Sequence, residues 1–590
     1  MNGSRLKAAL LLPVLVLACR QEPGRPPVIL LSIDTLRADR LARMPNLQRL
    51  AADAITFESA WTPVPLTLPA HASLFTGLLP PEHGVRDNAG FRLDPKLPTI
   101  ATILRQRGYA TGAAVSAYVL RRDTGIAGGF DFFDDAIEFV EGAPTGALHR
   151  RGEITLSRAL RWLDRQSEKP PFLFVHLFEP HTPYEPSYDA DVLLADRLAG
   201  ELFDELRARD LYDDALIVVL SDHGEGLGDH GEEEHGILLY REALQVPLLV
   251  KLPRNRRKGE RVAEAVQLID VLPTIAEVTG ANVRGQSLLE PKPRPIYGET
   301  LYPRIHLGWS ELRSLVRAPH HLIDGPKPEL YRLDTDPREQ RDVRAQERRA
   351  FSRLREDLAT FPQRQAAPQV SAEEAKKLAA LGYLTQTATV RSDKNPRDHL
   401  HELQARKEVT ALLGQGRFDE AAARIEALGW SDLRDDLAFA YERAGRLDDA
   451  ERTYRQAIRA TPELAHEVAL SLAGVLLRKG NLDEAARHAG VAAERSTQPK
   501  AARLMLAEIQ ALRRDLTGAL QILASIEPPH PPRYHFLLGD VLGSLGRTDE
   551  AIAAFEQEVQ RAPRDREARR RLELLRHIRS RNRANPPPLP

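Results

Sequence analysis

Two acidic side chains stand directly after two apolar stretches, where each is placed to bind a cation. Asp34 follows the run Val28–Ile33, and Asp222, with His223 beside it, follows Leu216–Leu220. In an open α/β sheet, ligands and catalytic groups gather at the carboxyl ends of the strands. Two carboxylates and an imidazole there make a divalent-cation site, and the imidazole favours zinc or manganese over calcium. Taken singly, each Asp is more often a turn former or a helix cap, so the prediction rests on the combination.

A threonine at the start of a helix-like stretch is the candidate nucleophile. Thr67 is followed by Pro69, and proline suits the first turn of a helix because its missing N–H costs nothing there. The free N–H groups and the dipole at such an N-terminus attract anions. A hydroxyl becomes a useful nucleophile when a cation lowers its pKa or a base takes its proton. The alternative is that Thr67 only caps the helix, and the local sequence alone favours that alternative.

The elements that must position these residues alternate between short apolar runs and amphipathic stretches. This alternation predicts an α/β sandwich with a mainly parallel sheet, and three later short runs predict a small antiparallel sheet. The predicted strands are Val28–Ile33, Phe172–Leu177, Leu216–Leu220 and Val246–Leu252, the helices are Asn46–Ala54, Thr99–Arg107, Glu153–Gln166 and Arg197–Arg207, and the later runs are Ser314–Val316, His320–Ile323 and Leu330–Leu333.

Five short motifs occur in a fixed order along residues 26–360. They are Ser-Ile-Asp-Thr-Leu-Arg-Ala-Asp (32–39), Thr-Leu-Pro-Ala-His-Ala-Ser (67–73), Glu-Pro-His-Thr-Pro-Tyr (179–184), Ser-Asp-His-Gly-Glu (221–225), and Glu-Leu-Tyr-Arg-Leu (329–333) with Asp336-Pro337. Together they resemble the sulfatase family within the alkaline phosphatase superfamily. The resemblance implies an alkaline-phosphatase-like sandwich and a metal-dependent enzyme that acts on an anionic ester.

The resemblance also implies a role for particular residues. Asp34, Asp222 and His223 match the metal ligands, and Thr67 matches the nucleophile, whose oxygen family members also place on the metal. His181 and His235 match positions that contact the transferred group or protonate the leaving oxygen. A loop over residues 86–88 approaches the site in relatives. The histidines outside these positions, at 83, 176, 306, 320 and 321, are interpreted as structural or exposed.

The sequence departs from the sulfatase pattern at three positions. Thr35 follows Asp34 where a second acidic ligand is usual, and His71 stands where arginine is expected. Thr67 replaces the Cys or Ser that becomes formylglycine, so a formylglycine mechanism is not expected. Threonine nucleophiles on zinc occur in nucleotide phosphodiesterases and phosphoethanolamine transferases of the same superfamily. The sequence therefore predicts hydrolysis or transfer of a phosphate ester through a phospho-threonine intermediate.

Alternatives remain open for the metal count and for the function. One metal on Asp34, Thr67, Asp222 and His223 is favoured. The other arrangement adds a second cation on His181 and His235, with Glu179 as the one further carboxylate. A sulfate-ester hydrolase that works without formylglycine is the second function. A catalytically silent, tethered interaction protein is the third.

A repeated turn motif begins near residue 400, after a connector at residues 361–398. Gly416, Gly445, Gly480 and Gly546 each open a similar hexapeptide, and a weaker copy begins at Arg514. The spacing is close to the roughly 34-residue period of helix–turn–helix repeats. Residues 399–575 thus resemble tetratricopeptide repeats, an all-α solenoid that implies a protein or peptide partner. Residues 576–590 are expected to be a disordered tail.

The N-terminus predicts export. Residues 1–19 place Arg5 and Lys7 before a short apolar run that ends at Cys19, the only cysteine. The run is too short to span a membrane, and its end resembles the lipobox of bacterial lipoproteins. We therefore expect a lipid anchor at Cys19 and a location in the cell envelope, on the periplasmic or extracellular side; a plain secretory peptide is the alternative. The formal net charge of -1 gives no sign of a nucleic-acid partner.

Overall fold

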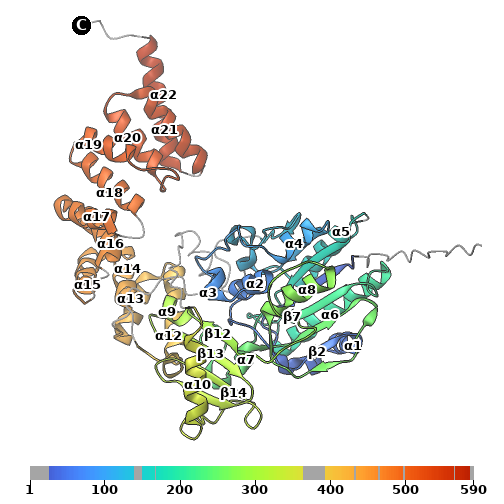
Figure 1. Ribbon diagram of the computed structural model, residues 1–590. Helices are drawn as coiled ribbons and strands as arrows, with labels where there is room; N and C mark the ends of the chain where they lie inside the picture. Colours follow the sequence, from blue (N-terminus) through green and yellow to red (C-terminus); the bar gives the residue numbers. More distant parts are fainter. Residues whose placement is uncertain are drawn as a thin grey trace, which may run out of the picture.

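The computed structural model describes residues 25–137, 149–166, 168–362, 393–430, 433–460, 462, 465–495, 499–563 and 565–584. The predicted signal peptide with Cys19 and most of the predicted connector lie outside the described residues. Figure 1 shows an α/β domain, a smaller sheet beside it, and a column of helices that ends at the C-terminus. No helix in the described part of the chain is long and apolar enough to cross a membrane.

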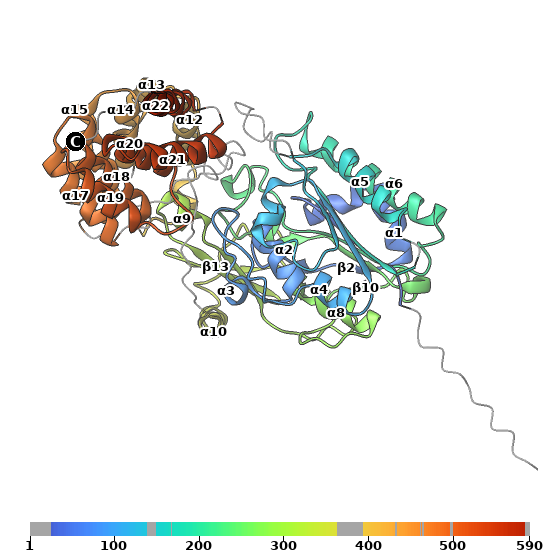
Figure 2. The same cartoon turned by 90° about the horizontal axis from the view of Figure 1, so that it is seen from above.

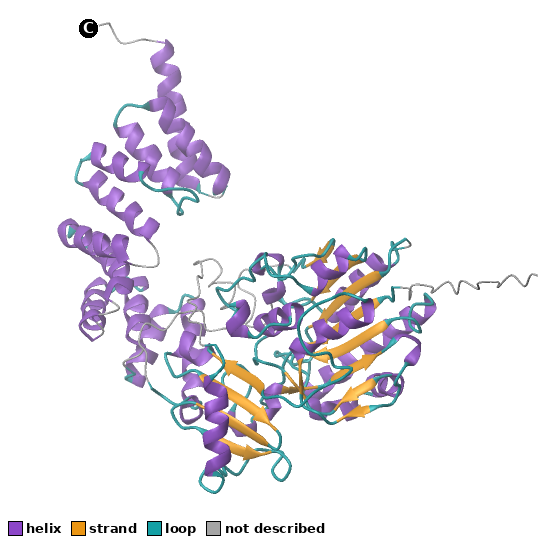
Figure 3. Cartoon of the chain, viewed as in Figure 1, coloured by secondary structure: helices purple, strands orange, loops and turns teal. Residues whose placement is uncertain are grey.

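An eight-stranded, mainly parallel sheet forms the centre of the α/β domain (Figure 3). β1 pairs in parallel with both β6 and β7, which brings the ends of these three strands to the same edge. In order across the sheet the strands are β10 (Arg261–Val262), β2 (Ile55–Phe57), β9 (Leu248–Lys251), β7 (Leu216–Ser221), β1 (Val28–Ile33), β6 (Pro171–Leu177), β4 (Ala110–Val115) and β5 (Phe132–Asp134). The predicted α/β sandwich is confirmed.

Helices cover both faces of this sheet, as Figure 2 shows from above. Since the central strands β1, β6 and β7 are mostly apolar and buried on both faces, each face needs such a cover. One face packs against α2 (Thr67–Thr76), α4 (Ile100–Gln106) and α8 (Val271–Thr279). The other face packs against α1 (Pro45–Asp53), α5 (Gly152–Leu163) and α6 (Tyr188–Ala208). α2, which begins at the candidate nucleophile Thr67, therefore packs against the first of these two faces.

The predicted strand over Val246–Leu252 is in fact two strands. β8 (Gln245–Val246) belongs to a three-stranded sheet with β3 (Ala60–Trp61) and β11 (Val266–Gln267), whereas β9 runs antiparallel to β7 in the main sheet. Pro247 separates them, because proline has no N–H to donate to a ladder.

The predicted small antiparallel sheet is present and has one more strand than expected. β13 (Leu312–Arg317), β14 (His320–Asp324) and β15 (Glu329–Arg332) follow the three apolar runs, and β12 (Ile296–Thr300) completes the sheet. The amphipathic helix α10 (Arg348–Ala359) packs against it through Leu354 and Leu358.

The C-terminal region is a run of paired helices, as the repeats predicted. The turn glycines at 416, 445, 480 and 546 all have positive φ, and Arg514, which begins the weaker copy, has φ +69°. The helices are α12 (Glu402–Gly414), α13 (Phe418–Leu428), α14 (Arg434–Arg443), α15 (Leu447–Ala460), α16 (Ala465–Arg478), α17 (Leu482–Arg495), α18 (Pro499–Leu512), α19 (Leu516–Ala524), α20 (Tyr534–Ser544), α21 (Thr548–Arg561) and α22 (Arg566–Ala584). α22 corrects the predicted tail: it is helical to Ala584 because Ala568 and Leu572 pack against Phe555 and its neighbours.

Candidate active site

Three fully buried side chains converge where β1 and β7 end. Asp34 follows β1, and Asp222 and His223 follow β7. The ligand atoms of the three lie within 4.8 Å of one another. His223 Nε2 is 3.6 Å from Asp34 Oδ1 and 3.5 Å from Asp222 Oδ2. Donors on a tetrahedral zinc ion stand about 3.4 Å apart, so this spacing fits one metal ion.

The polar atoms of this group fit a cation. Both oxygens of Asp34 and Oδ2 of Asp222 are buried with no hydrogen-bond donor among the described residues. Burial and the nearby Asp222 carboxylate raise the pKa of Asp34 well above its usual range, and burial also raises the pKa of Asp222. His223 Nδ1 is 3.1 Å from the Gly224 carbonyl, so it donates there and leaves the lone pair of Nε2 for a metal. A divalent cation would remove the cost of burying two uncompensated carboxylates.

Thr67 is the first residue of α2 and faces this group. Its Oγ1 lies 3.3 Å from His223 Nε2, and the residue is 1% exposed. The N-cap of α2 is Leu66, so Thr67 does not serve as the cap. The hydroxyl therefore completes a set of four donors, at a helix N-terminus that favours anions.

The loop at residues 86–88 reaches the site through one side chain. Asn88 Oδ1 accepts the Leu68 N–H at 2.8 Å, and Asn88 Nδ2 is buried with no acceptor in the part of the chain that the structure describes. Arg86 forms a buried ion pair with Glu299, and Asp87 Oδ1 lies 3.0 Å from His306 Nε2. The loop is thus held from behind, and the Asn88 amide is left as a donor beside Thr67.

His181 lines the same pocket as Asp34 and Thr67. Its Nδ1 lies 2.6 Å from the Thr182 carbonyl, while Nε2 has no partner among the described residues. This small pocket is also lined by Ala117, Tyr118, Val119 and Phe178. Burial lowers the pKa of His181 to about 3, which keeps the free imidazole neutral. The pocket thus brings together the Thr67 hydroxyl, the Asp34 carboxylate and a histidine with an unpartnered ring nitrogen.

His235 belongs to a buried chain of side chains that also includes Glu225. The His235 ring lies 4.4 Å from the His223 ring and 5.1 Å from the His181 ring, centroid to centroid. His235 Nδ1 is 2.9 Å from Glu225 Oε1, and the Tyr184 hydroxyl donates to Glu225 Oε2 at 3.0 Å. Burial raises the pKa of Glu225 to about 7 and lowers that of His235 to about 4. Glu225 was missed, although it stands in the Ser-Asp-His-Gly-Glu motif, because its partner is set by the fold.

The second metal position predicted as the alternative would use Glu179, His181 and His235. Glu179 Oε1 accepts the N–H of Gly152, the first residue of α5, while Oε2 is buried without a hydrogen-bond partner among the described residues. Among the described residues, neither group with metal-ligand spacing contains Glu179, His181 or His235. Of the two arrangements predicted from sequence, metal-ligand spacing is present for the one on Asp34, Asp222 and His223. A substrate role for His181 and His235 stays a prediction.

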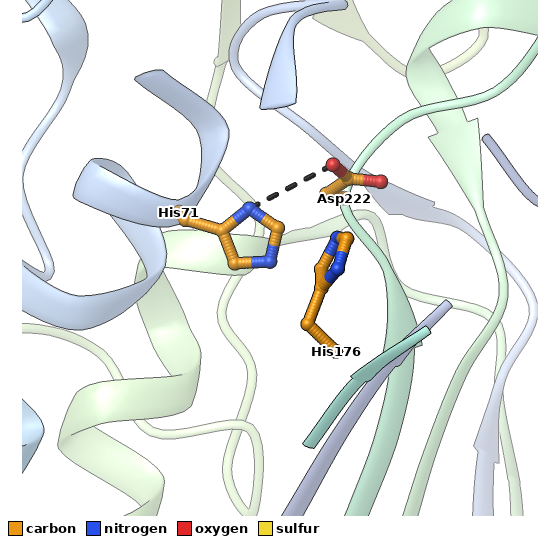
Figure 4. Close-up of side chains that lie close together, drawn as sticks. All are labelled: His71, His176 and Asp222. Atoms are coloured by element: carbon orange, nitrogen blue, oxygen red, sulfur yellow. Dashed lines mark ion pairs between the residues drawn. The ribbon is translucent and has the colours of Figure 1, made fainter. Parts of the chain in front are cut away.

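A further group with metal-ligand spacing contains His71, His176 and Asp222 (Figure 4). His71 Nδ1 is 2.7 Å from the Thr67 carbonyl and 3.7 Å from Asp222 Oδ2, and its Nε2 is 3.0 Å from Ser32 Oγ. Both nitrogens are thus used in hydrogen bonds. His71, which stands where the sulfatase pattern has arginine, ties the first turn of α2 to β1 and has no lone pair free for a metal.

His176, interpreted from sequence as structural or exposed, lies next to Asp34. It is fully buried, neither ring nitrogen has a hydrogen-bond partner within the described residues, and Nε2 lies 3.5 Å from Asp34 Oδ2. It pairs in register with Ser32, so both side chains lie on the face of Asp34. A lone polar residue inside the apolar run of β6 was the signal that could have found it.

The comparisons with known proteins agree with this fold. The sulfatase family model matches residues 26–281, and tetratricopeptide repeat models match residues 436–499 and 532–565. Arylsulfatase K of Canis lupus familiaris is 22% identical over 378 residues, which are 49% of this chain and 70% of that protein. Ectonucleotide pyrophosphatase/phosphodiesterase family member 3 of Rattus norvegicus is 24% identical over 223 residues, 35% of this chain and 26% of that protein. The solved structure of Ps i-CgsB has a TM-score of 0.50 at 18% identity and covers 60% of this chain and 96% of that chain.

Residues 26–281 therefore form a sulfatase domain, and tetratricopeptide repeats follow it. These residues are similar to sulfatases, and they contain a cluster of side chains that can hold a metal ion. The repeats suggest a surface for protein interaction.

A His176→Leu variant tests the support that His176 gives to Asp34. Outer-shell partners of metal ligands change affinity by roughly 10- to 100-fold, so we expect zinc binding to weaken by that amount. His176→Gln keeps an N–H donor and should lose less. Competition with a chromogenic chelator measures the affinity, and His83→Leu, a buried histidine that contacts Ser73 outside the metal group, is the control. Wild-type affinity in His176→Leu would show that His176 only fills space.

Proposed function

We propose that the sulfatase domain cleaves phosphate esters with Thr67 as the nucleophile, and that a divalent metal, zinc or manganese, is held by Asp34, Thr67, Asp222 and His223. The observation that carries the proposal is the position of Thr67 Oγ1, 3.3 Å from His223 Nε2 at the N-terminus of α2. A metal held there would supply positive charge that lowers the pKa of the Thr67 hydroxyl.

The residues around Thr67 suit a displacement at phosphorus. The Thr67 oxygen attacks in line, and the bond between phosphorus and the leaving oxygen breaks. The Asn88 Nδ2 donor and the N-terminus of α2 lie where negative charge develops on the remaining oxygens. Water, or the hydroxyl of an acceptor, then releases the group from Thr67.

His181 and His235 act on the substrate in this proposal. His181 Nε2 faces the pocket and orients the ester. His235 Nδ1 lies 2.9 Å from Glu225 Oε1, and this contact fixes the orientation of the imidazole. Since burial lowers the pKa of His235 to about 4, the neutral ring suits contact with the transferred group rather than protonation of the leaving oxygen.

Hydrolysis of a sulfate ester is the second candidate function. The similarity to arylsulfatase K favours it, and the similarity to the ectonucleotide pyrophosphatase/phosphodiesterase favours phosphate, over a smaller part of that relative. We favour phosphate because residue 67 is threonine and no formylglycine is expected from it. In the third alternative, a silent domain, the complete set of donors around Thr67 would have no use.

Replacement of Thr67 tests the nucleophile. Thr67→Ala should lower kcat/KM for p-nitrophenyl phosphate or bis(p-nitrophenyl) phosphate by about 10³-fold or more, while three metal ligands remain and most of the metal is kept. Thr67→Ser keeps a hydroxyl and should retain measurable activity. The control is Thr76→Ala on the same helix, whose hydroxyl bonds to the Ala72 carbonyl. Full activity in Thr67→Ala would contradict the proposal, and a phosphate on Thr67 in mass spectra would support it.

Matched p-nitrophenyl phosphate, diester and sulfate probes test the ester class. We expect a phosphate probe to be preferred by at least about 10-fold in kcat/KM, since the threonine alkoxide is suited to phosphorus. Activity should vanish after chelation and return with zinc or manganese rather than calcium, because an imidazole is among the ligands. Preference for sulfate would establish the second function; no turnover of any ester by metal-loaded protein would favour the silent domain.

We also propose that the chain is exported and tethered through lipid on Cys19. The support is the sequence of residues 1–19 alone. In a bacterial host, full-length protein should fractionate with membranes, and Cys19→Ala should move it to the soluble envelope fraction or leave it unprocessed. A soluble wild-type protein, cleaved without lipid on its N-terminal peptide, would establish the plain secretory alternative.

A further inference from the structure

The segment at residues 394–407, called here the anchor segment, joins the α/β domain to the repeats. It contains the start of α12, which lies where the two regions meet (Figure 1). Leu400 and Leu403 pack against an apolar cluster that includes Ile237, Leu238 and Tyr240 of the α/β domain. The first helix of the repeats is thus continuous with the packing of the catalytic domain.

Polar contacts fix the anchor segment along its length. The Ser310 N–H donates to the Lys394 carbonyl at 3.0 Å, and Arg397 pairs with Glu329 at 3.0 Å. The Arg406 guanidinium lies 5.7 Å from the centre of the Trp309 ring. These contacts come from different parts of the α/β domain, so the segment is held as a unit.

A hairpin in the α/β domain connects this segment to the active site. Backbone hydrogen bonds pair Gly226 with Glu234 at 2.7 Å and Leu227 with Glu233 at 3.1 Å. The ends of this hairpin are Glu225 and His235, which contact each other at 2.9 Å. The position of the hairpin therefore determines where the His235 imidazole lies.

The anchor segment touches the hairpin at two points. Lys407 Nζ lies 2.7 Å from Glu234 Oε1, and Glu234 is the residue before His235. Leu400 packs beside Gly231 at the turn of the hairpin. A Cβ added to Gly231 would lie 3.3 Å from Leu400 Cδ1, so the two residues are in close contact. One contact is ionic and next to His235, and the other is apolar and at the far end of the hairpin.

We propose that Lys407, from the first repeat helix, is a positioning residue of the active site that acts through Glu234 on the hairpin carrying Glu225 and His235. The inference rests on the role of His235 in the proposed function. The repeat region then completes the catalytic domain, and a partner that displaces α12 would alter turnover.

The Lys407–Glu234 pair is placed to affect catalysis more than stability. Its side chains are 39% and 42% exposed, and pairs of this kind contribute little to the stability of a fold. A small misplacement of a catalytic group, by contrast, lowers rates strongly. The effect of removing the pair should therefore appear in kcat while the melting temperature stays the same.

Charge reversal in the full-length, metal-loaded protein tests the proposal. Lys407→Glu and Glu234→Lys should each lower kcat for p-nitrophenyl phosphate by about 10-fold with little change in KM, and the double swap should restore it to within about 3-fold. Lys327→Glu is the matched control, because Lys327 forms a 2.6 Å pair with Asp398 at the same interface, away from the hairpin. It should leave kcat unchanged.

Hydrogen–deuterium exchange of the peptide spanning residues 225–235 provides a second readout that needs no substrate. Exchange should rise in each single variant and return in the double swap. If the wild-type protein turns over none of the esters, the proposed function fails, and this readout still decides the role of Lys407. Unaltered exchange and kcat in both single variants would overturn the inference. A rise in KM in Lys407→Glu that the double swap does not reverse would also overturn it, because Lys407 would then attract the substrate directly.

Discussion

Two carboxylates, Asp34 and Asp222, are buried side by side at the end of the central sheet, and the surrounding structure depends on how their charge is balanced. Three of their four oxygens have no donor within the described residues. Burial of unpaired charge costs several kcal/mol, so the fold is arranged for a cation. The remaining donors, Thr67 Oγ1 and His223 Nε2, face the same point.

The neighbouring elements hold the reactive groups around that point without adding charge to it. His71 links the first turn of α2 to Ser32 on β1, so the helix that carries Thr67 cannot shift relative to the strand that carries Asp34. Asn88 binds the Leu68 N–H from the other side. His71 stands where the sulfatase pattern has arginine, and a metal held by Asp34, Asp222 and His223 would supply positive charge for an anionic ester.

The tetratricopeptide repeats pack directly against this domain. Their first helix shares an apolar cluster with the α/β domain, and its Lys407 contacts the hairpin that ends at His235. A region that matches tetratricopeptide repeats is thus in physical contact with the hairpin beside the candidate site, and the two parts of the chain have a route for coupling.

The sequence by itself determined the layers and predicted which residues form the candidate site. Apolar runs covered on both faces predicted β1, β6 and β7, the turn glycines predicted the repeats, and ordered motifs located Asp34, Thr67, Asp222, His223, His181 and His235. These features are local, because periodicity, turn chemistry and short motifs depend on neighbours in the chain. β4 and the division of one predicted strand at Pro247 were not predicted. The local sequence there, rich in alanine and glycine in β4, has only a weak strand pattern, and tertiary packing determines the structure.

Only the tertiary structure decided the roles of His176, Glu225, Glu179 and Lys407. Each depends on a partner far away in the chain: His176 on Asp34, Glu225 on Tyr184, Glu179 on the start of α5, and Lys407 on Glu234. Residue types show what these side chains are able to do, but a carboxylate that caps a helix and one that supports a catalytic imidazole look alike in sequence. The strand register and the packing of the helices choose between them, because they set which polar groups share a buried space.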